Sequence, residues 1–244
     1  MIVKITEQNN KVYLSGDKEA LDILKALCTY VHSTRLVLEF IHIKAEGEEG
    51  FFEASDGIRF VRHKFYTDTP IDTEINGLID TEKIKKLKKG DFEIELESFE
   101  YIGHKYPDTD LLLNSFTFPN QLEITLPEDL FKTFYYLDKS GKDTGCIFTK
   151  EGIKINKTFV CKKVDGTVKH IDTELNVKIP LEVKDKFAIR AKYLHEFFQY
   201  YRKALRWQLS DFTLKIQYNT PEDPIRLVIL PPEEVYYIVM PLKY

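Results

Sequence analysis

The sequence contains few cysteines, no long apolar run and no excess of positive charge. Its 244 residues include three cysteines, Cys28, Cys146 and Cys161, which are widely spaced and odd in number. This usage offers neither a metal-binding spacing nor a disulfide framework, and it favours a reducing compartment, the cytoplasm. No run of about 18 apolar residues occurs, so we expect no membrane-spanning segment. The net charge of −4 argues against a uniformly basic nucleic-acid-binding protein.

The sequence also lacks the motifs that accompany common active sites. There is no Gly-x-x-x-x-Gly-Lys loop, no Gly-x-Ser-x-Gly turn and no His-Glu-x-x-His helix. The six histidines do not cluster, and we interpret His42 and His195 as structural residues. Asp108 and Asp110 are interpreted as parts of a loop, without the further ligands of a calcium site. We therefore predict no catalytic residues, no metal site and no cofactor; an enzyme on an unrelated β-rich scaffold is the disfavoured alternative.

What the sequence does contain is an internal repeat. Residues 91–96 recur as residues 211–216, and each copy is an alternating strand that follows a basic amphipathic helix. Two copies of one unit of about 120 residues are typical of a repeat architecture. We therefore predict an α+β fold with two tandem domains, residues 1–118 and 119–244, each with two helices and many strands.

Periodicity places the secondary-structure elements. Apolar residues at helical spacing predict helices over 17–32, 81–89, 127–140 and 191–206, with Asp17 as an N-cap and Gly90 as a C-cap. Alternating apolar residues predict strands. These lie near residues 1–6, 11–14, 36–44, 51–54, 59–65, 72–75, 92–97, 100–104, 122–126, 146–149, 153–155, 158–163, 174–179, 212–218, 225–230 and 235–240.

Positive charge is concentrated on two of the predicted helices. Residues 81–89 carry a net charge of +4 and residues 191–206 a net charge of +3, while the rest of the chain is acidic. A basic surface on an acidic body is suited to phosphate binding. The alternative interpretation is an ordinary solvated helix face. Because no stacking aromatics and no helix-turn-helix or zinc-finger spacing accompany the lysines, we expect no sequence-specific reading of bases.

Three segments carry a resemblance to a known family. The first is Arg35-Leu36-Val37-Leu38 followed by Ala54-Ser55-Asp56-Gly57-Ile58-Arg59-Phe60. The second is Tyr106-Pro107-Asp108 with Leu112 and Leu113 after it, and the third is Tyr237-Ile238-Val239-Met240-Pro241-Leu242-Lys243-Tyr244. In this order and spacing they resemble the bacterial replicative sliding clamp, the beta subunit of DNA polymerase III. The resemblance covers nearly the whole chain, but only the second and third domains of a three-domain subunit.

The resemblance implies a fold and a function. Clamp domains have two helices packed on antiparallel sheets, and six domains close a ring with the helices lining the hole. The protein would then be a processivity factor that encircles double-stranded DNA independently of its sequence, and a two-domain chain would need three copies, a homotrimer. The DNA-facing residues would be Lys83, Lys85, Lys86, Lys89, Lys132, Lys192, Arg202, Lys203 and Arg206.

In this family the matched segments meet at an apolar pocket that binds short peptides of DNA polymerase and the clamp loader. The implied pocket residues are Leu38, Ser55, Gly57, Ile58, Arg59, Phe60, Pro107, Leu112, Ile238, Met240 and Leu242. Ile58 replaces a family histidine and Phe60 a leucine, so the partner peptides are expected to differ. The alternative interpretation of the last segment is a buried strand. The alternative functions are a non-ring regulator that binds clamp partners, or one part of a mixed ring.

Overall fold

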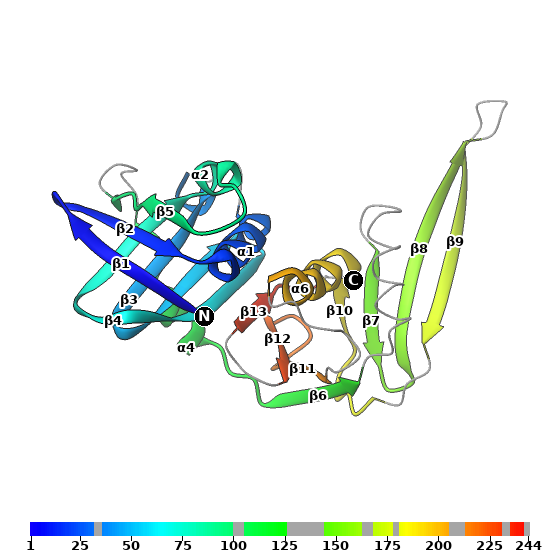
Figure 1. Ribbon diagram of the computed structural model, residues 1–244. Helices are drawn as coiled ribbons and strands as arrows, with labels where there is room; N and C mark the ends of the chain where they lie inside the picture. Colours follow the sequence, from blue (N-terminus) through cyan, green and yellow to red (C-terminus); the bar gives the residue numbers. More distant parts are fainter. Residues whose placement is uncertain are drawn as a thin grey trace. The chain divides into compact units, whose positions relative to one another are not determined.

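The computed structural model consists of two compact units (Figure 1). It describes residues 1–31, 36–99, 105–125, 144–162, 168–177, 181–204, 213–230 and 235–241. The first unit is formed by Met1–Ser115 together with Tyr200–Trp207 and Pro232–Ile238. The second is formed by Phe116–Gln199, Gln208–Pro231 and Val239–Tyr244. The first unit therefore includes two segments from the C-terminal half of the chain. Sequence periodicity does not indicate this exchange.

A twisted sheet forms the body of the first unit. Its strands lie in the order β5-β2-β1-β4-β13, and β3 also pairs with β4. Most pairs are antiparallel, but β1 and β4 run parallel through the pairs Ile2–Tyr66 and Val3–Thr67, so the expectation of purely antiparallel sheets is wrong here. The bounds are β1 Ile2–Gln8, β2 Lys11–Gly16, β3 Phe40–Ser55, β4 Arg59–Asp80, β5 Phe92–Glu95 and β13 Val235–Val239.

Strands β3 and β4 form a long hairpin that joins strands predicted as separate. The pairing register shifts on both sides of Gly47, whose φ of +61° is accessible to glycine at little cost. This irregularity lets one strand continue through residues 46–49. These residues are polar, and the sequence pattern therefore predicted a break between two strands at this point. The start of the predicted strand 36–44 is also wrong, because Leu36–Glu39 forms the 3-10 helix η2.

Helix α1 (Lys18–Leu27) forms as predicted. The Asp17 side chain accepts a hydrogen bond of 3.0 Å from the amide of Ala20 and so caps the first turn. Leu21, Leu24 and Leu27 are buried, as their spacing indicates. The helix is shorter than the predicted 17–32, because the chain tightens into the 3-10 helix η1 (Cys28–Tyr30).

Helix α2 (Thr81–Lys86) ends three residues earlier than predicted, and Gly90 is not its C-cap. Leu87 has extended backbone angles, and its amide donates to the Ile84 carbonyl at 3.1 Å. The Lys25 ammonium of α1 donates to the Leu87 carbonyl at 2.8 Å. Helix α2 therefore ends where a side chain of α1 provides the hydrogen bond that the Leu87 carbonyl would otherwise lack. Lys88 and Lys89 therefore lie beyond the helix.

A short helix occupies the segment predicted as a loop around Asp108 and Asp110. Helix α4 spans Thr109–Ser115. The Asp108 carboxylate accepts a 2.9 Å hydrogen bond from the Leu111 amide in its first turn. An aspartate before Thr-Asp is therefore a helix start here rather than part of a turn.

The second unit contains two sheets and helix α6 (Ala191–Ala204). One sheet has the order β12-β11-β6 and the other the order β10-β7-β8-β9. The helix predicted over 127–140 and the strand over 100–104 lie outside the described residues. The strand bounds are β6 Asn120–Thr125, β7 Gly145–Thr149, β8 Gly152–Lys162, β9 Val168–Val177, β10 Phe187–Arg190, β11 Thr213–Tyr218 and β12 Ile225–Leu230.

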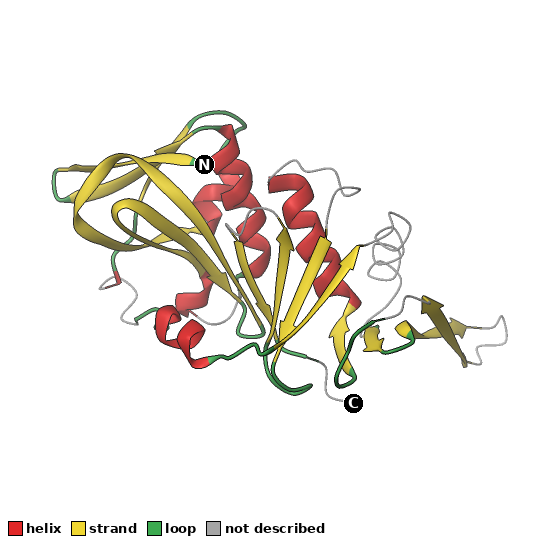
Figure 2. Cartoon of the chain, turned by 90° about the horizontal axis from the view of Figure 1, so that it is seen from below, coloured by secondary structure: helices red, strands yellow, loops and turns green. Residues whose placement is uncertain are grey.

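Strand pairing is similar in the two units. In the first unit β2, which leads into α1, pairs antiparallel with β5, which follows α2. In the second unit β6 pairs antiparallel with β11, which follows α6. The two repeated segments, 91–96 and 211–216, thus contribute strands with the same kind of partner. Figure 2 shows the helices and strands of the chain coloured by secondary structure.

Candidate partner-peptide and DNA-facing surfaces

A tight turn between β3 and β4 presents one apolar side chain to solvent. Gly57 has a φ of +83°, and its amide donates to the Ser55 hydroxyl oxygen at 3.1 Å. The Asp56 carboxylate accepts from the amides of Ile58 and Arg59 at 2.9 and 2.7 Å, and from the Arg59 Nε at 2.8 Å. These contacts satisfy the turn internally. Ile58, at its tip, is 46% exposed.

The base of this turn contacts the last strand through an aromatic residue. Arg59 is buried, and its guanidinium lies 5.0 Å from the ring centroid of Tyr30. The Tyr30 ring packs edge-on against Tyr237 of β13, with centroids 5.6 Å apart. Ile238 and Phe60 are both buried. The structure thus brings the Asp-Gly-x-Arg turn near β13 within the first unit.

Other predicted pocket residues differ in exposure. Leu38 is buried in a cluster with Leu78 and Tyr106, whereas Pro107 and Leu112 are exposed. Met240, in the second unit, is 41% exposed because β13 ends at Val239, so a fully buried final strand does not describe this segment. Leu242 lies outside the described residues.

Sequence comparison by motif missed Leu111, which is 67% exposed. The signal was present, because three consecutive leucines follow Tyr-Pro-Asp and a single face of a short helix cannot bury all of them. Exposed leucines beside a proposed pocket are what an apolar peptide would contact.

Two of the predicted DNA-facing lysines of helix α2 have carboxylate partners. Lys83 forms an ion pair with Glu97, and its pKa is raised chiefly by that hydrogen bond. Lys85 forms an exposed ion pair of 2.7 Å with Glu82, which raises the lysine pKa in the same way. Such surface pairs contribute little to stability, but they reduce the charge available to phosphate. Lys86 and Lys89 are exposed.

Helix α6 has one apolar and one polar face, as predicted. Leu194, Phe197, Phe198 and Tyr201 are buried. Lys192 and Arg202 are exposed on the other face, and the Lys192 ammonium lies 3.8 Å from Glu196. The side chain of Lys203, together with Lys132 and Arg206, lies outside the described residues.

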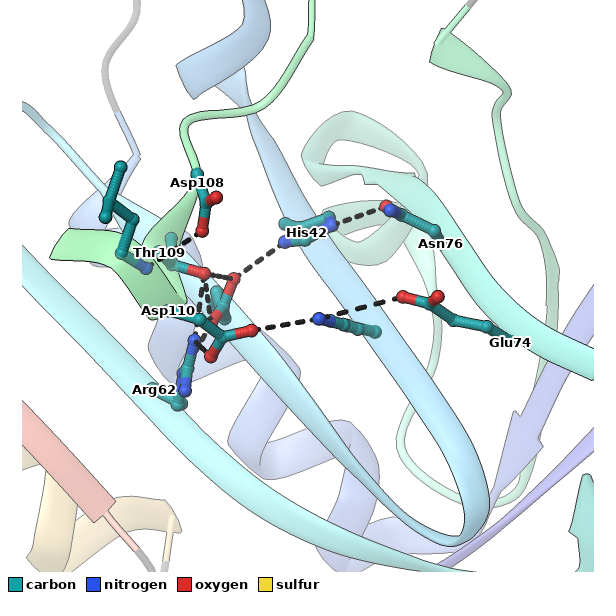
Figure 3. A network of polar contacts seen from close by, with 10 residues as sticks. His42, Arg62, Glu74, Asn76, Asp108, Thr109 and Asp110 are labelled. Carbon is teal, nitrogen blue, oxygen red and sulfur yellow. Dashed lines mark hydrogen bonds and ion pairs between the residues drawn. The ribbon is translucent and has the colours of Figure 1, made fainter. Parts of the chain in front are cut away.

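A network of buried polar groups, drawn in Figure 3, is centred on Glu53 of β3. Glu53 is fully buried. Its carboxylate accepts hydrogen bonds from His42 Nδ1 at 2.7 Å, from Arg62 Nε, and from the Thr109 hydroxyl at 2.9 Å. His42 Nε2 lies 2.8 Å from the Asn76 side-chain oxygen. His42 therefore has a structural role, as interpreted, but in a polar cluster that periodicity could not reveal.

The network extends to the protein surface through Asp110. Arg62 Nη2 donates to the Asp110 carboxylate at 2.8 Å, and Lys44 Nζ lies 2.9 Å from the same group and 3.7 Å from Glu74. The hydrogen bond from Lys44 is the main cause of the lowered pKa of Asp110, and Asp110 in turn raises the pKa of Lys44. Paired charges of this kind stay ionised near neutral pH.

A pocket of about 380 Å³ opens beside this network. It shares only Pro107 with the predicted peptide pocket. Among the described residues, no three His, Cys, Asp or Glu side chains are grouped as a metal site would require. No helix in the described parts of the chain is long and apolar enough to cross a membrane. The pocket is lined by His42, Lys44, Asn76, Phe99, Lys105, Tyr106, Pro107, Asp108, Thr109 and Asp110.

Two units of helices packed on sheets, with equivalent strand pairs, define a class of repeated α+β domain. Within that class, the fold is that of bacterial DNA polymerase III beta subunits, the sliding clamps. The DNA polymerase sliding clamp of Pseudomonas aeruginosa superposes with a TM-score of 0.68 at 11% identity, covering 99% of this chain and 76% of the other.

Further solved structures give the same result. The Bacillus subtilis sliding clamp has a TM-score of 0.66 at 14% identity, with 99% and 75% of the two chains covered. The Helicobacter pylori beta clamp bound to a DNA ligase peptide has a TM-score of 0.66 at 12% identity, with 99% and 76% covered. No protein-family model and no curated protein matches the sequence. At these identities the likeness establishes the fold.

Proposed function

We propose that this protein is a DNA sliding clamp, a processivity factor that encircles duplex DNA and tethers replication proteins. The observation that carries the proposal is the fold likeness to sliding clamps over 99% of the chain. The proposed role is not enzymatic, because a ring retains DNA by topology and its partners perform the chemistry. The proposed location is the cytoplasm, where the DNA polymerase would be found.

We assign the two proposed clamp domains to residues 1–118 and 119–244. Their DNA-facing surface would be formed by the basic helices, and the exposed Lys86, Lys192 and Arg202 support this assignment. Contacts of ammonium and guanidinium groups with phosphate are independent of base sequence and allow sliding. The acidic remainder of the chain would face outward, where it repels DNA.

The proposed assembly is a homotrimer. Six clamp domains close a ring in the family that the sequence resembles, and a chain with two of them reaches six in three copies. Each contact would join different surfaces of neighbouring copies, and such a contact closes a ring only at the right rotation.

The proposed partners are DNA polymerase and the clamp loader, bound through short apolar peptides. Ile58 and Leu112, both in the first unit, support this site, because large apolar side chains are exposed at these predicted positions. Among the solved structures of the same fold, the Helicobacter pylori clamp is bound to a DNA ligase peptide.

Light scattering coupled to gel filtration tests the proposal. We expect a particle of about three times the 28.7 kDa chain mass, and we expect it to stay on closed circular DNA after loading but to leave once the DNA is linearised. A stable monomer at micromolar concentration would contradict the ring. Such a monomer that still bound clamp-partner peptides would instead favour the non-ring regulator.

A further inference from the structure

Helix α4 (Thr109–Ser115) buries a polar residue and exposes apolar ones, which is the reverse of an ordinary amphipathic helix. Its buried residue is the polar Thr109, whereas Leu111 is 67% and Leu112 37% exposed. A surface helix normally places leucines inward and polar residues outward. Leu113 is only partly buried, so apolar packing attaches this helix weakly, and polar contacts provide the rest of its attachment to the first unit.

Those contacts are made by the first two residues of α4. The Thr109 hydroxyl lies 2.9 Å from both carboxylate oxygens of Glu53 and accepts a hydrogen bond of 2.9 Å from Arg62 Nη2. Asp110 forms ion pairs of 2.8 Å with Arg62 and 2.9 Å with Lys44. Two adjacent residues thus join α4 to three side chains of the β3–β4 hairpin (Figure 3).

We propose that Glu53 and Arg62 are positioning residues, which anchor α4 so that Leu111 and Leu112 form one rigid wall of the partner-peptide site. The part of this inference that concerns peptides rests on the proposed function. The anchor itself rests only on the contacts within the first unit.

The position of Glu53 explains why the anchor is rigid. Glu53 and Arg62 are directly paired residues of the β3–β4 ladder, so both side chains emerge from a fixed backbone. Both are at least nine-tenths buried, and His42 contacts Oε2 of Glu53 while Arg62 contacts Oε1. Hydrogen bonds to buried charged groups are stronger and more directional than surface contacts. A rigid wall lowers the ordering cost of peptide binding.

The test removes the anchor from the α4 side, because replacing Glu53 would leave Arg62 buried without its partner and could unfold the unit. The variant T109V/D110N leaves Glu53, Arg62 and His42 in place. We expect amide hydrogen exchange at residues 111–115 to become at least about tenfold faster, while exchange in α1 stays unchanged. We also expect the affinity for a labelled synthetic peptide with leucine and phenylalanine anchors to fall about tenfold.

Two controls make the outcome specific. The single variant T109S keeps a hydroxyl at this position and leaves Asp110 unchanged. Its amide exchange and its peptide affinity should therefore be close to those of the wild type. E74Q removes a carboxylate that contacts Lys44 but not α4, and it should change neither measurement. Unchanged exchange in T109V/D110N overturns the anchor, and faster exchange with unchanged affinity overturns the positioning role. If the wild-type protein does not bind the peptide, the proposed function fails, and the exchange measurement alone still decides the anchor.

Discussion

At the scale of single residues, His63 on β4 is a buried group with an unusual protonation state. It is fully buried, and its Nδ1 lies 2.7 Å from the Tyr200 hydroxyl. Burial is the main cause that lowers the pKa of His63 to about 3. The imidazole is therefore neutral in the folded protein over the pH range in which an unfolded histidine gains a proton.

This difference predicts acid sensitivity. Below about pH 6.5 the unfolded chain binds a proton at His63 that the folded chain does not bind until about pH 3, so the free energy of unfolding should fall as the pH is lowered. Where the unfolded chain binds one proton more than the folded chain, the free energy of unfolding falls by about 1.4 kcal/mol for each pH unit. Urea unfolding at pH 7, 5.5 and 4.5 should therefore show a smaller pH dependence for His63→Gln than for the wild type.

The partner of His63 provides the control for this measurement. Tyr200→Phe removes the hydroxyl but keeps a titratable, buried imidazole, so its pH dependence should remain close to that of the wild type. If His63→Gln and the wild type lose stability equally between pH 7 and 4.5, the acid sensitivity arises elsewhere.

At the scale of elements, the β3–β4 hairpin depends on a close approach at Gly50. A Cβ atom at this position would overlap the Phe65 ring and would lie 2.8 Å from the Ala45 Cβ. Phe65 is fully buried and cannot move aside easily. The strand therefore needs glycine here for space rather than for backbone conformation.

We predict that Gly50→Ala lowers the free energy of unfolding by about 2 kcal/mol, as overpacking of a core does. Gly77→Ala is the matched control, because its Cβ would meet no atom closer than 3.4 Å and the residue lies in the same hairpin. Its effect should be below about 1 kcal/mol. Denaturant unfolding measures both, and equal effects would show that the contact with Phe65 is relaxed without cost.

The sequence predicted elements well where one local signal decided them. The Asp17 cap and the leucine spacing were sufficient for α1, because both act within a few residues. The predicted end of α2 was wrong because the ammonium group of Lys25, distant in the chain, donates a hydrogen bond to the Leu87 carbonyl. The network around Glu53 could not be predicted, since its members come from three elements and each looks ordinary in its own segment.

At the scale of the whole molecule, the repeat and the clamp motifs predicted the fold, because the order and spacing of segments along the whole chain carry that information. The equivalent strand pairs and the likeness to sliding clamps support that part. The proposed sites were harder to predict in detail. Exposure separates the predicted pocket residues, with Ile58 at the surface and Leu38 buried, and no motif carries that information.

The remaining prediction concerns the DNA-facing surface. Sliding contacts with phosphate release counterions, so the logarithm of affinity falls with the logarithm of salt concentration by about 0.9 per phosphate contact. A short linear duplex is the right ligand, because it has free ends and a ring cannot retain it by topology. We choose Lys86, Lys89 and Arg202 for replacement by glutamine, because Lys83 and Lys85 already pair with carboxylates.

We expect the triple variant to bind this duplex more weakly and with a salt slope smaller by up to about 2.7, the value for three lost contacts. The control variant replaces Lys4, Lys150 and Lys184, which are exposed but lie outside the two basic segments, residues 81–89 and 191–206. It changes the net charge equally, so it should bind nearly as well as the wild type if the two basic segments face DNA. Equal losses in the two variants would mean that overall charge, and not the helical surface, governs the contact with DNA.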